Sequence, residues 1–253
     1  MDRGLVKLDT DLINSSATKI AVCLCIDISG SMGTIVDYRG FVSSGQTGYI
    51  DGKEYHLGSG GKSRMDVLQN GIETFISTIK KDPIARKSVE LSVIAFNEDI
   101  NVLSEFKSVD TINLPSIDPE GDTDIGKVVL FALDRLEERK RMYKSYGIDY
   151  YRPIFVLMTD GENNGSASTY NAACRRVHEY EELGKVATFL IGMGSESDLE
   201  EMSRLSGKRP AKQLKDEKFD EFFKWLSKSV SIVSQSTPGD KVPLPPTSGW
   251  EDL

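Results

Sequence analysis

The chain has 253 residues, of which 39% are hydrophobic and 28% are charged, as is typical of a globular α/β protein with one core. Its formal net charge of -8 repels nucleic acid and anionic membranes, so neither is an expected partner. The longest apolar run is far too short to span a membrane, and residues 1–5 lack the pattern of a signal peptide. We therefore expect a cytoplasmic protein, with Cys23 and Cys25 as apolar core residues rather than a metal or redox pair.

The first predicted strand covers residues 19–27 and leads into a polar motif. Seven consecutive apolar residues at 20–26 predict a strand buried on both faces, as in the middle of a parallel sheet. The strand ends in Asp27-x-Ser29-x-Ser31. Because ligands bind at the carboxyl ends of strands in open α/β sheets, these hard oxygen donors predict a site for a small hard cation, most simply Mg²⁺. The alternative is a turn and a helix cap without a ligand.

An insertion at residues 36–63 follows the motif and is rich in Gly, Ser, Tyr and Asp. Within it, we expect residues 38–42 and 49–57 to pair as a small hairpin, with Asp51-Gly52 as a second turn. Its place in the chain, directly after the polar motif, puts this insertion beside the predicted cation site.

Strands alternate with helices over the rest of the chain. Helices are predicted at 64–81, 125–147, 168–183, 197–206 and 216–233, and strands at 89–96, 100–106, 153–159, 185–192 and 210–214. The short connection at 97–99 makes the strand at 100–106 an antiparallel edge. The alternation predicts a Rossmann-like three-layer αβα fold with a mostly parallel central sheet.

Two further polar positions follow predicted loops or strands. Thr123 lies in a Gly- and Pro-containing loop that begins a helix, and Asp160 comes directly after the buried strand at 153–159. If the strands that end in Asp27 and Asp160 are neighbours, all of these side chains meet in one crevice at the switch point of the sheet. The predicted metal-site residues are Asp27, Ser29, Ser31, Thr123 and Asp160.

With these residues in this order, the chain resembles the von Willebrand factor A (vWA, integrin I-like) domain family over residues 19–233. The family's metal-ion-dependent adhesion site, or MIDAS, combines Asp-x-Ser-x-Ser, a Thr in a Gly-rich loop and an Asp-Gly after a later strand. The resemblance implies that the three hydroxyls contact a divalent cation (Mg²⁺, Mn²⁺ or Ca²⁺) directly, while the two carboxylates act through bound waters. It also implies that the cation accepts an Asp or Glu from a protein partner.

One position departs from the family pattern, which commonly has Gly where this chain has Asp122. A carboxylate there either weakens acceptance of the partner's acid or turns outward and caps the following helix. The overall layout and the Pro-rich tail resemble, more loosely, bacterial vWA proteins of tellurite-resistance and stress-response operons. That resemblance implies a kinase and a phosphatase of the same operon as partners.

These features favour a docking module and predict no catalytic residue. The main alternative is a metal-dependent phosphohydrolase of the haloacid dehalogenase type, but its pattern requires a second Asp as the general acid where this chain has Ser29. His56 and His178 are the only histidines, and no Gly-x-Ser-x-Gly or His-Glu-x-x-His motif occurs. A third interpretation is a scaffold whose metal is purely structural.

The predicted domain organisation has three parts. Residues 1–18 form an N-terminal arm, residues 19–236 the vWA domain, and residues 237–253 a Pro-rich flexible tail of polyproline character. Trp250-Glu251-Asp252 either belongs to a disordered end, or docks on a partner, or folds back onto the molecule's own cation.

Overall fold

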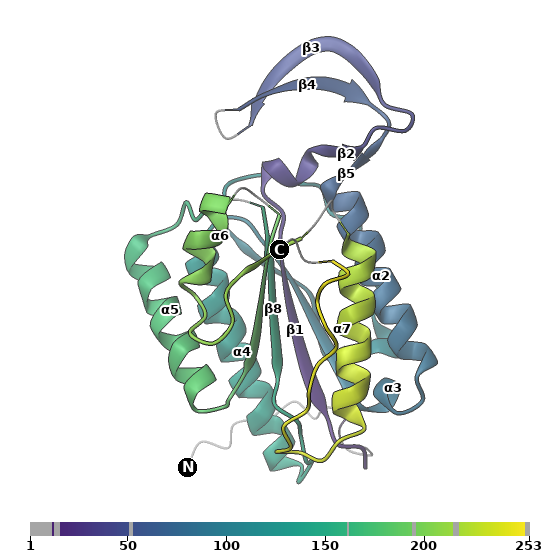
Figure 1. Cartoon of the computed structure of the whole chain (residues 1–253), viewed down its shortest axis with the longest axis vertical. Coiled ribbons are helices and arrows are strands. Elements are labelled where there is room, and N and C mark those ends of the chain that lie inside the picture. Colours follow the sequence, from purple (N-terminus) through teal and green to yellow (C-terminus); the bar gives the residue numbers. More distant parts are fainter. Residues whose placement is uncertain are drawn as a thin grey trace, which may run out of the picture.

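The computed structural model describes residues 12, 16–50, 53–160, 162–193, 196–214 and 218–250. Its centre is a six-stranded sheet with the strand order β10-β9-β8-β1-β6-β7. Figure 1 shows the two central strands, β1 and β8, side by side. The strands of this sheet are β1 (Ile20–Asp27), β6 (Val89–Phe96), β7 (Ile100–Ser108), β8 (Ile154–Thr159), β9 (Ala187–Gly192) and β10 (Lys212–Gln213).

The central sheet is parallel except at one edge. β1 pairs in parallel with β6 on one side and with β8 on the other, whereas β7 pairs antiparallel with β6. The turn between β6 and β7 is too short for a crossover, which is why β7 must reverse direction. The predicted mostly parallel sheet with one antiparallel edge strand is confirmed.

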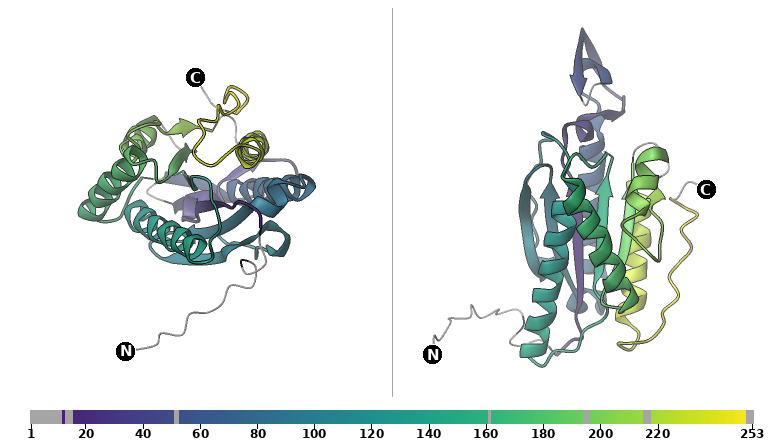
Figure 2. Two further views of the ribbon diagram at one scale, coloured as in Figure 1. Left: turned by 90° about the horizontal axis from the view of Figure 1, so that it is seen from below. Right: turned by 90° about the vertical axis from the view of Figure 1, so that its left-hand side faces the viewer.

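Helices cover both faces of the sheet, as the two views in Figure 2 show. One face packs against α2 (Arg64–Lys81), α3 (Ala85–Ser88) and α7 (Phe219–Ser234). The other packs against α4 (Ile125–Ser145), α5 (Ala167–Glu182) and α6 (Glu196–Ser203). Alternate residues of β1 enter the two cores, so this strand is buried on both sides, as predicted. No helix in the described ranges combines the length and the hydrophobicity that a membrane span requires.

The insertion forms two short antiparallel ladders that stand beyond the carboxyl end of β1 (Figure 1). β2 (Ile35–Asp37) pairs with β5 (Lys62–Ser63), and above them β3 (Val42–Ile50) pairs with β4 (Lys53–Ser59). The predicted pairing of residues 38–42 with 49–57 is therefore wrong. The sequence does not indicate the full length of β3, because its glycines and serines have a low β-propensity. The predicted turn at Asp51-Gly52 lies outside the described residues.

The C-terminal segment packs against the domain. Trp250 is 1% exposed, and its ring lies 5.0 Å from that of Phe222 and 5.3 Å from that of Trp225, measured between centroids. Trp225 Nε1 donates a hydrogen bond of 2.8 Å to the carbonyl oxygen of Pro245. These contacts place Pro245 and Trp250 against α7, whereas residues 237–241 are exposed. The flexibility expected for the tail stays a prediction. Glu251 and Asp252 lie outside the described residues.

Two smaller features complete the fold. Short 3₁₀ helices lie at η1 (Gly30–Gly33) and η2 (Val109–Thr111). Most of the predicted N-terminal arm lies outside the described residues, but Leu12 is 1% exposed and belongs to the core beneath α4 and α5.

The contact between α4 and α5 gives a stability test at Gly126. A Cβ atom at this position would lie 2.7 Å from the backbone nitrogen of Tyr170. We expect Gly126→Ala to destabilise the protein by about 2 kcal/mol, because overpacking against backbone outweighs the gain of ~1 kcal/mol in helix propensity. Chemical denaturation measures this change. Arg141→Ala on the exposed side of α4 serves as the control, and an unchanged or raised stability of Gly126→Ala would contradict the close packing.

Candidate metal centre

Asp27 ends β1 as a buried carboxylate. It is 0% exposed, and its Oδ1 accepts a 2.8 Å hydrogen bond from the backbone nitrogen of Ser29. Its Oδ2 accepts a hydrogen bond from the hydroxyl of Thr159. Thr159 is the last residue of β8, and the register of β1 with β8 brings the ends of the two strands side by side. The apolar runs that pair these strands therefore position the first ligand candidate.

Two serines in and beside η1 connect this carboxylate to Asp160. The hydroxyl oxygens of Ser29 and Ser31 are 3.1 Å apart. Ser31 Oγ donates a 2.7 Å hydrogen bond to Oδ1 of Asp160, although the two residues are 129 positions apart in the chain. The structure thus brings together the Asp-x-Ser-x-Ser motif and the Asp that follows β8.

Thr123 joins the same group from the loop before α4. Its hydroxyl donates to Oδ2 of Asp27 over 3.4 Å. The loop is held against η1 by a 3.1 Å hydrogen bond from the backbone nitrogen of Gly30 to the oxygen of Gly121. Gly121 has a φ of 79°, a backbone conformation that favours glycine. All five predicted side chains therefore meet at the carboxyl end of the sheet.

The electrostatics of Asp27 are strongly perturbed. Burial raises the pKa of this carboxyl, and the negative charge of Asp160 raises it further, to about 7. Hydrogen bonds from Thr159 and Ser29 act in the opposite direction on this pKa. The raised pKa means that the negative charge of Asp27 is poorly stabilised by its surroundings. Binding of a proton or of a cation would neutralise this charge.

Arg64 is a charged neighbour of this group that the sequence does not predict. Its Nη1 donates to Oδ2 of Asp160, and the two side chains are 15% and 1% exposed. Arg64 is the first residue of α2, and its backbone nitrogen donates a 2.8 Å hydrogen bond to the carbonyl oxygen of Thr34. The sequence does contain the capping box of Ser63 and Asp66, which marks Arg64 as the first residue of the helix.

The loop residues around Thr123 exclude one of the two roles considered for Asp122. Asp122 is exposed, and its backbone nitrogen donates 2.8 Å to Glu98 Oε2. The N-cap of α4 is Asp124, whose Oδ1 accepts a 3.0 Å hydrogen bond from the backbone nitrogen of Lys127. The expectation that Asp122 caps this helix is therefore wrong. Asn164 Oδ1 accepts 3.2 Å from the nitrogen of Thr123 and fixes this loop to the segment after β8.

The donor set fits a hard divalent cation. It offers three neutral hydroxyls and two carboxylates, and Mg²⁺ prefers oxygen ligands of this kind with few direct carboxylates. The part of the chain that the structure describes has no group of three or more His, Cys, Asp and Glu placed to hold a metal. The five side chains differ from such a group because only two of them are acidic. Their assignment as metal ligands stays a prediction.

The fold and this site together define a three-layer αβα domain with clustered hydroxyls and carboxylates at its switch point. The model of the von Willebrand factor type A domain family matches residues 22–162, which is more than half of the chain and includes all five side chains. The chain therefore belongs to the von Willebrand factor type A domain family. Domains of this family generally mediate protein–protein interactions, often in a metal-dependent way.

Solved structures share the fold at low sequence identity. The PilB minor pilin from Streptococcus sanguinis has a TM-score of 0.56 and 14% identity over 85% of this chain and 62% of that chain. The conserved hypothetical protein BatB from Bacteroides thetaiotaomicron has a TM-score of 0.50 and 15% identity over 86% of this chain and 100% of that one. The chain thus spans less than two thirds of the pilin. No curated protein matches the sequence.

The raised pKa of Asp27 predicts a pH-dependent stability. The folded protein binds the Asp27 proton more tightly than the unfolded chain, whose carboxyl has a pKa near 3.8. Stability in the presence of a chelator should therefore fall as the pH rises from about 4 to 7, by on the order of 4 kcal/mol. Thermal unfolding across this range measures the effect. Asp27→Asn should remove most of the slope, and a slope that Asp27→Asn leaves unchanged would assign the effect to other groups.

Arg64 gives a test of the charge balance at Asp160. Arg64→Ala should raise the affinity for Mg²⁺ or Mn²⁺ by roughly tenfold, because a positive charge beside Asp160 opposes an incoming cation. Isothermal titration calorimetry measures this affinity. The control is Arg39→Ala, which removes an arginine whose side chain is 88% exposed. A weaker affinity of Arg64→Ala would show instead that Arg64 is needed to hold Asp160 in place.

Proposed function

We propose that the protein is a docking module that binds a protein partner through a divalent cation. Mg²⁺ is the simplest candidate, and Mn²⁺ or Ca²⁺ fit the same donors. The observation that carries the proposal is the convergence of five oxygen-bearing side chains from three distant segments on one edge of the sheet. The proposed metal residues are Asp27, Ser29, Ser31, Thr123 and Asp160.

The charges of the site favour acceptance of a carboxylate. Three of the five donors are neutral, and Arg64 already compensates part of the charge of Asp160. A bound dication would therefore keep enough positive charge to attract an Asp or Glu side chain of a partner. The hydroxyls of Ser29 and Ser31 lie 3.1 Å apart, and the hydroxyl of Thr123 contacts Asp27. The buried Asp27 anchors the loop that carries the serines.

The same residues give little support to an enzyme. A haloacid dehalogenase-like phosphohydrolase needs a general acid two residues after Asp27, and Ser29 has no ionisable proton in the required range. His178 Nε2 lies 3.0 Å from the carbonyl oxygen of Arg204 at the far end of α5, and His56 lies in β4 of the insertion. The looser resemblance to bacterial tellurite-resistance and stress-response vWA proteins makes a kinase or phosphatase a candidate partner.

The experiment measures the cation and the partner's acid separately. Mn²⁺ bound to the protein is followed by electron paramagnetic resonance, and acidic and amidated versions of one peptide are then added. We expect Asp27→Ala to lose Mn²⁺ affinity by at least tenfold. The acidic peptide should alter the Mn²⁺ signal of the wild-type protein, because its carboxylate replaces a bound water.

The control is Asp99→Ala, which removes an acid that is 90% exposed near the same edge of the sheet and should change neither result. A chelator should abolish peptide binding without unfolding the domain. If the chelator unfolds the domain, the metal is structural. If the wild-type protein binds Mn²⁺ but treats the acidic and amidated peptides alike, docking through an acid is wrong.

A further inference from the structure

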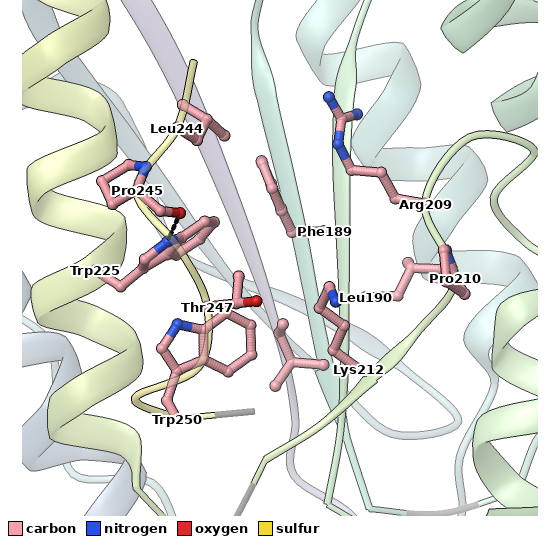
Figure 3. Close-up of a pocket in the computed structure, with 11 residues that line it drawn as sticks. Phe189, Leu190, Arg209, Pro210, Lys212, Trp225, Leu244, Pro245, Thr247 and Trp250 are labelled. Carbon is pink, nitrogen blue, oxygen red and sulfur yellow. Dashed lines mark hydrogen bonds between the residues drawn. The ribbon is translucent and has the colours of Figure 1, made fainter. Parts of the chain in front are cut away.

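A cavity lies between α7, β9, β10 and the C-terminal segment (Figure 3). Its volume is about 270 Å³, and it shares no residue with the candidate metal centre. Most of its wall is aromatic or aliphatic. The apolar lining includes Phe189, Ile191, Trp225, Leu244 and Trp250.

The apolar walls of this cavity are held in place by contacts within the protein. Figure 3 shows Trp225 and the C-terminal residues on one side and Arg209, Pro210 and Lys212 on the other. The hydrogen bond of Trp225 Nε1 with Pro245 fixes the C-terminal segment on α7. The Phe189 and Trp225 rings meet edge to face at a centroid distance of 5.3 Å. The cavity is therefore already formed without a ligand, as is usual for small-molecule sites.

The two charged side chains that line the cavity, Arg209 and Lys212, are both cations. Arg209 and Lys212 are both half-buried, and no Asp or Glu in the described part of the chain lines the cavity. The guanidinium of Arg209 lies over the Phe189 ring at 5.3 Å and forms no ion pair among the described residues. Trp250 Nε1 is buried and has no hydrogen-bond partner within the residues that the structure describes. A chain with a net charge of -8 thus has a local site that favours an anion with an apolar body.

We propose that this cavity binds a small apolar carboxylate, with a medium-chain fatty acid as the ligand class. Its hydrocarbon chain would lie among the Phe189, Trp225 and Trp250 rings, and its carboxylate would pair with Arg209 and Lys212. At the ~30 Å³ that one water occupies in the liquid, the cavity has room for about ten non-hydrogen atoms. Octanoate has this size. An amine of the same length would place its charge against two cations.

The protein carries its own reporter for this test. Trp225 and Trp250 are the only two tryptophans, and both line the cavity, so the intrinsic tryptophan fluorescence reports on this site alone. We expect octanoate to change the emission with a saturable one-site curve and to raise the melting temperature. Octylamine and octanol, which have the same chain without the anion, should bind at least tenfold more weakly.

Charge variants complete the experiment. Arg209→Gln combined with Lys212→Gln should weaken octanoate binding at least tenfold, whereas Lys228→Ala on the exposed face of α7 should not. The melting temperature without ligand shows whether each variant is folded. Asp27→Ala and a chelator should leave octanoate binding unchanged, which separates this site from the proposed docking function. Non-saturable emission changes, or equal binding of octylamine, would overturn the proposal.

Discussion

The structure depends on one costly arrangement, a carboxylate that is buried at the end of a central strand. Among the described residues, Asp27 contacts hydroxyls and a backbone N–H but forms no ion pair. Burial of a charge without a full counter-charge is unfavourable, so the surrounding fold must hold it in place. Three features hold the surroundings of Asp27 in place. They are the pairing of β1 with β8, the position of the Thr123 loop and the ion pair of Asp160 with Arg64.

The sequence predicts the parts of this arrangement that follow from strong local patterns. The apolar runs of β1 and β8 predict two central strands, and in an α/β sheet their polar ends must share one edge. The helix at 64–81 has the bounds that its periodicity indicates, because its Ser63 cap and the following Asp82-Pro83 mark both ends. Each of these features is determined by residues that lie within or directly beside the strand or helix concerned.

Other features depend on contacts that no local pattern specifies. Arg64 reaches Asp160 across 96 positions of the chain, and a long side chain at a helix start has many possible partners. The Pro-rich composition after residue 237 gives no sign that Trp250 packs on Phe222 and Trp225. In the insertion, the Ser and Gly residues of β3 give it a low β-propensity. This strand forms because it pairs with β4, which the sequence does not show.

The projecting insertion has a consequence for how the protein behaves in concentrated solution. In its described part, β3 and β4 pair with each other and with no other strand, and Val42, Tyr49 and Leu57 are 66%, 73% and 44% exposed. A two-stranded ribbon is marginally stable alone, and open backbone edges with apolar side chains are templates for further strands. A second ribbon of the same kind has the backbone groups and apolar side chains to pair with such an edge, and this pairing becomes more favourable as the concentration rises.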